Sequence, residues 1–248
     1  MIYFTGAGPG AADLITVRGM ELLRRADTVI YAGSLVNPEL LNYCSDRCVK
    51  MNSAFMTLEE VIGAMTSCPK EQTVVRLHTG DPSLYGAIRE QMDALDRLGY
   101  AYEVVPGVSS MNAAAAALRA EYTLPGVSQT LIVSRMAGRT PVPEKESIRS
   151  LAAHGASMAL FLSVSMLEEL CAELVAGGYP PATPAAVVYR ATWPDEEIVR
   201  GTLEDLPKKA SHIGRTALVL VGGFMGSEYT RSRLYDPSFS HMFREAGK

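Results

Sequence analysis

Short runs of aliphatic and β-branched residues recur along the chain, each bounded by glycine, proline or polar turns, and stretches with helical spacing separate most of them. The runs are apolar on both faces, which is typical of strands in a parallel sheet covered by helices. The predicted strands are 2–5, 28–31, 73–77, 102–105, 130–134, 159–163, 185–189 and 217–221. The predicted helices are 14–25, 57–66, 84–98, 110–119, 146–153 and 166–177. This pattern predicts an α/β protein.

The pattern divides near the middle of the chain, which predicts two α/β domains, 1–118 and 119–248. The first predicted sheet is mostly parallel. In the second half, the stretch AVVYRATWPDEEIVRGTL predicts two antiparallel strands that join near Pro194, so we expect a mixed second sheet. Residues 138–147 predict a proline-rich loop, and residues 227–248 predict a polar surface tail.

The composition narrows the possible functions. With 48% hydrophobic and 20% charged residues, the chain has the composition of an ordinary globular protein. Its net charge of -4 argues against nucleic acid as a partner, because such binding needs a basic surface. The apolar runs are too short to span a membrane and the N-terminus lacks a secretory pattern, so we expect a cytoplasmic protein. The 4 cysteines and 4 histidines lack the spacing of a zinc site, so no metal is expected.

Five glycine-rich or polar turns follow predicted strands, at the edge where open α/β sheets bind ligands. They are GAGPG, HTGDPSLYG, PGVSS, SRMAGRTPVPE and LSVSM. The first resembles a dinucleotide-binding turn, but Pro9 removes an N–H group and the next strand is not followed by an acid that could hold a ribose. Both departures disfavour an NAD-dependent reductase. A tight turn with a purely structural role is the alternative.

Two of these turns offer polar groups to a ligand. Gly80 allows close approach of the backbone, and Asp81 offers a carboxylate, although capping of the following helix is an equal alternative. Ser109 and Ser110 offer hydroxyl and amide groups at another junction between a strand and a helix. The sequence contains no G-x-S-x-G elbow, P-loop or H-E-x-x-H motif. This indicates chemistry in which the protein positions two reactants and a cofactor supplies the reactivity.

Five stretches in order together resemble the tetrapyrrole methyltransferases that use S-adenosylmethionine. They are GAGPGAADLITVRGMELLRRADTVIYAGSLV, LHTGDPSLYG, VPGVSSMNAAAAAL, GRTPVPE and YRATWPDEEIVRGTL. The resemblance runs from Ile2 to about Gly223. Within that family, YAGSLV and GRTPVPE resemble most the enzymes that methylate carbon 11 of precorrin-4 or cobalt-precorrin-4 in cobalamin (vitamin B12) biosynthesis.

The resemblance implies a homodimer with two α/β domains of the tetrapyrrole methylase type, and with S-adenosylmethionine in a cleft between the domains. S-adenosylhomocysteine would be the product, and the resemblance names no catalytic base. By matching motifs, the implied cofactor-binding residues are Pro9, Gly80, Asp81, Leu84, Ser109, Ser110, Leu162, Ala191 and Ala217.

A tetrapyrrole substrate of this kind carries several carboxylates, so we expect basic side chains around it. The candidates for substrate binding are Arg135, Arg139 and His78. Arg18 and Arg76 are further candidates, for which structural pairing or exposure to solvent is the alternative. Trp193, the only tryptophan, could stack on a ring or pack structurally.

Two other functions compete with this one. The same fold and cofactor could serve another acceptor, such as uroporphyrinogen III, another precorrin or a protein side chain. We expect the GRTPVPE loop to distinguish acceptors. A non-catalytic protein that binds a tetrapyrrole or a nucleotide would show binding without turnover. Whether the ring already holds cobalt depends on the pathway rather than on these residues.

Overall fold

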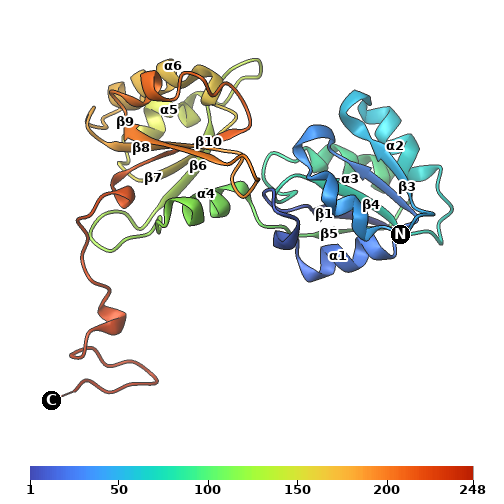
Figure 1. The fold of residues 1–248 in the computed structure, drawn as a ribbon, viewed down its shortest axis with the longest axis horizontal. Coiled ribbons are helices and arrows are strands. Elements are labelled where there is room, and N and C mark those ends of the chain that lie inside the picture. The colour runs from blue at the N-terminus through green and yellow to red at the C-terminus, as the bar shows by residue number, and fades with distance from the viewer. Residues whose placement is uncertain (248) are drawn as a thin grey trace. The chain divides into compact units, whose positions relative to one another are not determined.

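The computed structural model describes residues 1–247 and contains two five-stranded sheets (Figure 1). The chain forms two compact units. Unit 1 contains Met1–Ala113 and Arg190–Glu196, and unit 2 contains Ala114–Tyr189 and the residues from Glu197 onward. The domain boundary between residues 118 and 119 stays a prediction, because a compact unit is not by itself an independently folding domain.

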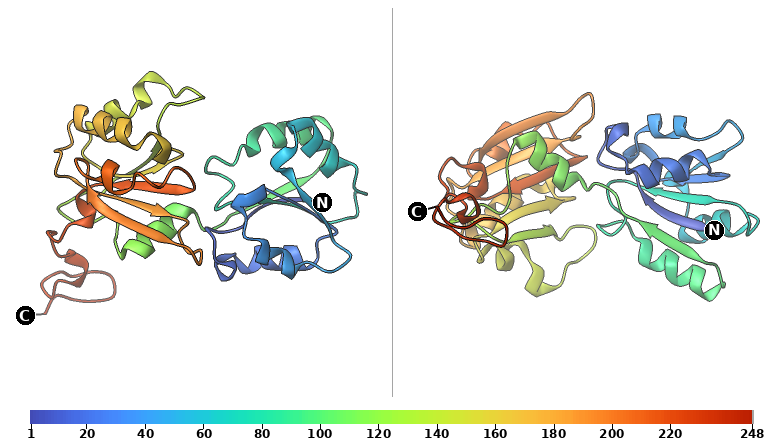
Figure 2. Two further views of the ribbon diagram at one scale, coloured as in Figure 1. Left: turned by 45° about the horizontal axis from the view of Figure 1, so that its top comes forward. Right: turned by 90° about the horizontal axis from the view of Figure 1, so that it is seen from below.

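Unit 1 is built on a parallel sheet with the strand order β3-β2-β4-β1-β5. Its strands are β1 (Ile2–Gly6), β2 (Thr28–Tyr31), β3 (Val49–Asn52), β4 (Val74–His78) and β5 (Tyr102–Val105). Its helices are α1 (Val17–Arg24), α2 (Leu58–Thr66) and α3 (Ile88–Arg97). Helix α1 covers one face of the sheet, and α2 and α3 cover the other (Figure 2). Leucines of α1 pack on the first face, and apolar residues of α2 and α3 pack on the second. All strands therefore end at the same edge, and their loops leave there.

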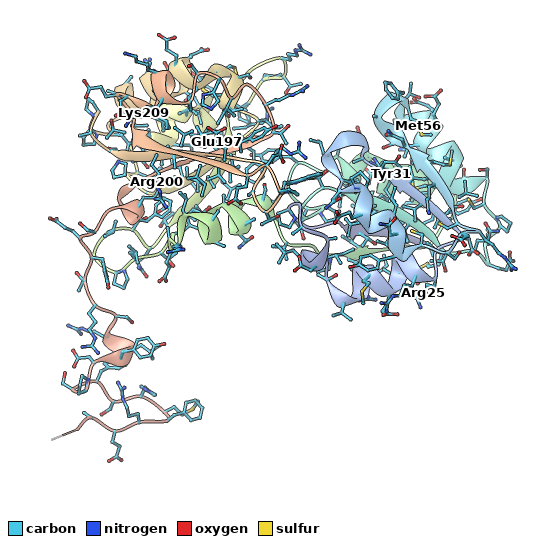
Figure 3. All side chains as sticks on the ribbon, viewed as in Figure 1. Arg25, Tyr31, Met56, Glu197, Arg200 and Lys209 are labelled. Atoms are coloured by element: carbon cyan, nitrogen blue, oxygen red, sulfur yellow. The ribbon has the colours of Figure 1, made fainter. Side chains whose placement is uncertain are left out.

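Unit 2 is built on a mixed sheet with the order β6-β7-β10-β8-β9. Its strands are β6 (Leu131–Arg135), β7 (Ser157–Phe161), β8 (Pro184–Tyr189), β9 (Glu197–Thr202) and β10 (Ala217–Val221). Its helices are α5 (Ile148–Ala152), α6 (Leu167–Ala176) and α7 (Leu206–Lys209), and α4 (Ser110–Leu118) runs into it from unit 1. Arg200 of β9 (Figure 3) donates to the carbonyl oxygen of Leu118 at the end of α4 (2.8 Å). The predicted α/β fold with a mixed second sheet is confirmed.

Several element boundaries differ from the predictions. The edge strand β3 was missed because most of its residues are exposed and carry no apolar pattern. Helix α3 begins at Ile88 rather than residue 84, because Tyr85 and Ala87 have positive φ angles (56° and 49°) that interrupt a helix. Strand β7 ends before Leu162, whose φ is 54°.

The remaining elements are short. Turns of 3-10 helix lie at Ala12–Leu14, Gly33–Leu35, Pro38–Tyr43, Ser53–Phe55, Glu144–Glu146, Val164–Met166, Gly223–Met225 and Arg233–Tyr235. The predicted tail, 227–248, is mostly exposed over its described part, and Lys248 lies outside the described residues. Among residues 1–247, no helix has the length and apolar composition needed to cross a membrane.

Candidate functional site

Three glycine-containing loops meet at the carboxyl edge of the sheet in unit 1, after β1, β4 and β5. The N–H of Gly8 donates to the carbonyl oxygen of Gly80 (3.2 Å), and the N–H of Gly80 donates back to Gly8 (2.8 Å). A Cβ atom on Gly107 would lie 2.1 Å from the carbonyl oxygen of Gly80 and 2.8 Å from the Cα of Gly6. Glycine is required here because the loops pack backbone against backbone.

The opening G-x-G-x-G turn does not form a phosphate cradle. The N–H of Ala7 donates to His78 (2.7 Å), that of Gly8 to Gly80, and that of Ala11 to the hydroxyl of Thr192 (2.9 Å). Pro9 has no N–H group. These donors serve contacts within the protein, which gives a physical reason for the departure from the dinucleotide-binding pattern.

The carboxylate of Asp81 joins the loop after β4 to the loop after β5. Its Oδ2 accepts from the N–H of Gly107 (2.8 Å), and its Oδ1 accepts from the N–H (2.8 Å) and the hydroxyl of Ser83. Burial alone would raise the pKa of Asp81, but these hydrogen bonds lower it below its ordinary value. Asp81 does not cap α3, which begins at Ile88. Leu84, in the same turn, is half-buried.

Ser109 and Ser110 lie where the loop after β5 enters α4. Ser109 is buried, and its hydroxyl accepts weakly from the N–H of Met111 (3.4 Å). A Cβ atom on Gly80 would lie 3.7 Å from the backbone nitrogen of Ser110. The structure therefore brings the predicted residues of the first three loops together.

Two buried polar atoms at the end of β4 have no hydrogen-bond partner among residues 1–247. They are Nε2 of His78 and the hydroxyl oxygen of Thr79, next to Gly80. Burial, with a smaller effect of Arg76, lowers the pKa of His78 to about 3, so its ring is neutral near pH 7. His78 is therefore not part of a basic cluster, although a contact with a substrate stays a prediction. Sequence reasoning missed Thr79, whose only signal is its place between a strand and Gly80.

The other basic candidates of unit 1 have structural partners. Arg76 is buried and donates to Gln91 (3.3 Å) and to the carbonyl oxygen of Ile30 (3.2 Å). Arg18 is exposed and forms an ion pair with Glu103. Both contacts favour the structural alternative for these arginines.

The segment Arg190–Glu196 joins two strands of unit 2 but belongs to unit 1. Ala191, a predicted cofactor contact, is 7% exposed there. Trp193 donates from Nε1 to the carbonyl oxygen of Pro9 (3.1 Å). Trp193 therefore packs against the opening glycine turn, which favours its structural interpretation.

In unit 2, the strand register places Arg135, Leu162 and Ala217 at one edge of the mixed sheet. Arg135 at the end of β6 is level with Phe161 at the end of β7, and Ala217 at the start of β10 is level with Tyr189. Leu162 is 68% exposed and has a positive φ, a combination of strain and exposure that is common at functional sites. Ala217 is half-buried.

The loops after β6 and β7 are joined by side chains. The buried hydroxyl of Ser163 accepts from the N–H of Met136 (2.8 Å) and donates to the carbonyl oxygen of Phe161 (2.7 Å). Sequence reasoning noted this serine only as part of the LSVSM turn.

The guanidinium of Arg135 binds backbone carbonyl groups at and just before the start of the proline-rich loop. It donates to the carbonyl oxygens of Met136 (3.1 Å), Thr140 (3.2 Å) and Pro141 (2.8 Å). Arg139 is exposed on this loop and makes no hydrogen bond or ion pair with the rest of chain 1–247. Its guanidinium is thus available to an anionic ligand. Within the described part of the chain, no three His, Cys, Asp or Glu side chains gather to hold a metal ion.

Comparison with known proteins gives this geometry a context. Residues 1–207 match the family of Tetrapyrrole (Corrin/Porphyrin) Methylases. The cobalt-precorrin-4 C(11)-methyltransferase of Methanocaldococcus jannaschii is 51% identical over 251 residues, which cover 100% of this chain and 97% of that protein.

Solved structures agree. The X-ray structure of a cobalamin biosynthetic enzyme, cobalt precorrin-4 methyltransferase, has a TM-score of 0.88 at 47% identity and covers 91% of this chain and 96% of that one. The uroporphyrin-III C-methyl transferase of Thermus thermophilus, complexed with S-adenyl homocysteine, has a TM-score of 0.75 at 27% identity and covers 89% and 96%. The chain therefore belongs to the tetrapyrrole (corrin/porphyrin) methylases.

Proposed function

We propose that this protein transfers a methyl group from S-adenosylmethionine to carbon 11 of precorrin-4 or cobalt-precorrin-4, in cobalamin biosynthesis, and releases S-adenosylhomocysteine. The observation that carries the proposal is the similarity over the whole chain to a protein named for this reaction. The motifs of the glycine loops and of the GRTPVPE loop support it.

The residues of unit 1 fit such a cofactor. The Thr79 hydroxyl is buried without a partner in the described chain, and the neighbouring Gly80, with no side chain, lies close to the backbone of Ser109 and Ser110. We propose that the cofactor is held by Pro9, Gly80, Asp81, Leu84, Ser109, Ser110 and Ala191, with Leu162 and Ala217 as further contacts from unit 2. When bound, S-adenosylmethionine supplies a methyl group that its sulfonium already activates.

The protein's own residues then bind and orient the two reactants. Both oxygens of Asp81 accept hydrogen bonds from Ser83 and Gly107, so we propose that Asp81 also fixes the two loops that contact the cofactor, besides contacting it. The partner-free Thr79 hydroxyl would donate to or accept from the ligand. Correct placement of two reactants lowers the barrier by itself, because their encounter no longer costs translational freedom.

For the acceptor, we propose that Arg139 binds a ring carboxylate and that Arg135 holds the loop on which Arg139 lies. His78 would contribute a neutral nitrogen, since burial keeps its pKa low. This division predicts separable effects. Replacing Asp81 by Ala should weaken cofactor binding, whereas replacing Arg139 by Ala should weaken binding of the macrocycle.

The proposal is tested by incubating the protein with S-adenosylmethionine and, in parallel, precorrin-4, cobalt-precorrin-4 or uroporphyrinogen III. A mass gain of one methyl group on carbon 11 of either precorrin-4 form is expected. Methylation of uroporphyrinogen III alone would show that the acceptor is uroporphyrinogen III rather than either form of precorrin-4. Calorimetric binding of the cofactor without methylation of any acceptor would favour the non-catalytic alternative.

We also propose that the protein is a homodimer, as the resemblance to its family implies, and that it is cytoplasmic. Light scattering of the purified chain should give twice the mass of 26.7 kDa, and cell fractionation should recover the protein in the soluble fraction. A monomer that is active at all concentrations would contradict the dimer.

A further inference from the structure

The opening turn of the chain is held by a segment 180 residues or so further along. The Nε1–H of Trp193 donates to the carbonyl oxygen of Pro9 (3.1 Å), and the hydroxyl of Thr192 accepts from the N–H of Ala11 (2.9 Å). Between them, Gly10 fits tightly under the indole. A Cβ atom on Gly10 would lie 2.2 Å from Cδ1 of Trp193. The two side chains thus fix both ends of the turn 9–11.

The segment Arg190–Glu196 is itself braced. Arg190 forms an ion pair with Asp195 (3.0 Å) and lies over the Trp193 ring, 4.2 Å from its centroid. The N–H of Thr192 donates to a carboxylate oxygen of Glu196 (2.6 Å). Arg190 and Thr192 have positive φ angles of 44° and 70°, a strained backbone that the bracing maintains.

Two further contacts hold the turn 9–11 from outside. The buried side chain of Asn37 donates to the carbonyl oxygen of Gly10 (2.9 Å). Gly8 pairs with Gly80 on the other side. Pro9, a proposed cofactor contact, therefore lies between one anchor in the loop after β4 and another on Trp193.

We propose that Trp193 and Thr192 are positioning residues that hold the turn 9–11, and with it Pro9, in the conformation that binds S-adenosylmethionine. The inference rests on the proposed function and deepens it. Neither residue needs to touch the cofactor, because each acts through the backbone of the turn. Ala191 lies in the same braced segment, so the segment fixes two proposed contacts at once.

The test compares Trp193→Phe and Thr192→Val with a matched control. Phe keeps most of the ring packing but removes the donor to Pro9, and Val keeps the shape of Thr but removes the acceptor for Ala11. The control is Tyr179→Phe, which removes another aromatic donor to a backbone carbonyl, that of Ala156 in unit 2. All three changes remove one hydrogen bond to the backbone, but only the first two involve the turn.

We expect Trp193→Phe and Thr192→Val each to weaken calorimetric binding of S-adenosylhomocysteine about five- to tenfold, and to raise the KM for S-adenosylmethionine with a nearly unchanged kcat. Tyr179→Phe should lower the urea midpoint without changing the affinity for S-adenosylhomocysteine or the KM for S-adenosylmethionine. In the double variant the two effects should be less than additive, because both act on one turn.

Wild-type cofactor affinity in both Trp193→Phe and Thr192→Val would overturn the inference. So would an equal loss of affinity in Tyr179→Phe, because the effect would then follow general stability. The proposed function fails differently, through a wild-type protein that neither binds S-adenosylhomocysteine nor methylates an acceptor. Binding and turnover in the wild type with unaffected variants leave the function standing and remove only the positioning role.

Discussion

The two units organise the loops at their sheet edges in different ways. In unit 1 all strands are parallel, so the loops after β1, β4 and β5 leave at one edge and crowd each other until only glycines fit between them. In unit 2 the strands β9 and β10 run the opposite way, so fewer loops leave at the corresponding edge. Side chains, those of Ser163 and Arg135, join the loops there instead.

This difference shows how one protein can combine a rigid and an adaptable surface. Backbone pairing such as that of Gly8 with Gly80 leaves little freedom for the loops of unit 1, which would suit the cofactor site that we propose there. The proline-rich loop of unit 2 accepts two hydrogen bonds from the guanidinium of Arg135 and exposes Arg139. The backbone packing of unit 1 should therefore tolerate substitution least.

Replacing Gly107 by Ala should have the largest effect. The new Cβ would lie 2.1 Å from the carbonyl oxygen of Gly80, a rigid backbone atom, so the loops must separate. We expect a loss of about 3 kcal/mol or more in the free energy of unfolding by urea denaturation. Gly63→Ala in α2 is the control, since nothing lies within 4 Å of its Cβ, and it should gain roughly 0.5–1 kcal/mol. Equal stability of both variants would contradict close packing.

The pH dependence of the free energy of unfolding should reveal the buried, neutral ring of His78 at the end of β4. The folded-state pKa of His78 is lowered to about 3, so the unfolded chain takes up a proton first as the pH falls below about 6.5. Stability should then drop between these values, with a contribution of at most about 1.4 kcal/mol per pH unit. His78→Gln should remove that part of the slope in urea titrations. The same change at the exposed His154 is the control, and identical slopes in both variants would refute the burial of a neutral His78.

Ser163→Ala tests the side-chain hydrogen bonds that join the loops after β6 and β7 in unit 2. The change removes a buried hydroxyl and leaves the N–H of Met136 and the carbonyl oxygen of Phe161 without this partner. We expect a loss of about 2 kcal/mol that is independent of pH, because a hydroxyl does not titrate in this range. Ser165→Ala, two residues along the chain and exposed, should cost little. A loss of stability that varied with pH would contradict a link made by a hydroxyl alone.

Asp81→Asn tests the charged link of unit 1 and should cost slightly less, about 1–2 kcal/mol near neutral pH, because the side chain is only half-buried. Hydrogen bonds lower the folded-state pKa of Asp81, so its stabilisation is present above the unfolded pKa of about 4 and is lost as the pH falls through the folded value. The difference between wild type and variant should therefore shrink in acid. A difference that stays constant down to pH 2 would mean that charge plays no part in joining the loops.

Much of the fold was predictable because buried strands carry strong patterns. The predicted bounds of β2, β5 and β10 match the structure, since most of their residues are β-branched, aliphatic or aromatic. The exposed edge strand β3 has no such pattern. The start of α3 could not be found because Tyr85 and Ala87 adopt positive φ without being glycines.

Within the candidate site, sequence reasoning found the glycine loops because glycine itself marks close approach of the backbone. It could not find the contact between Trp193 and Pro9, because the two residues are 184 positions apart and nothing in either motif refers to the other. It also could not tell that Arg135 turns back onto its own loop, because an arginine before a proline-rich segment is equally compatible with a ligand. Tertiary contacts decide these roles.

A smaller effect on stability is expected for Arg135→Ala, which tests the proline-rich loop of unit 2. The carbonyl oxygens of Thr140 and Pro141 lie in an exposed loop, so water can replace the guanidinium, and the loss should stay below about 1 kcal/mol. If the loop serves the acceptor, the KM for the macrocycle should nevertheless rise while the KM for S-adenosylmethionine stays constant. Arg139→Ala should raise the same KM with almost no change in stability, since its exposed side chain makes no hydrogen bond or ion pair within residues 1–247. Because Arg135 acts by holding the loop that carries Arg139, the double variant should be little worse than Arg139→Ala alone. Fully additive effects would instead mean that each arginine binds the macrocycle independently.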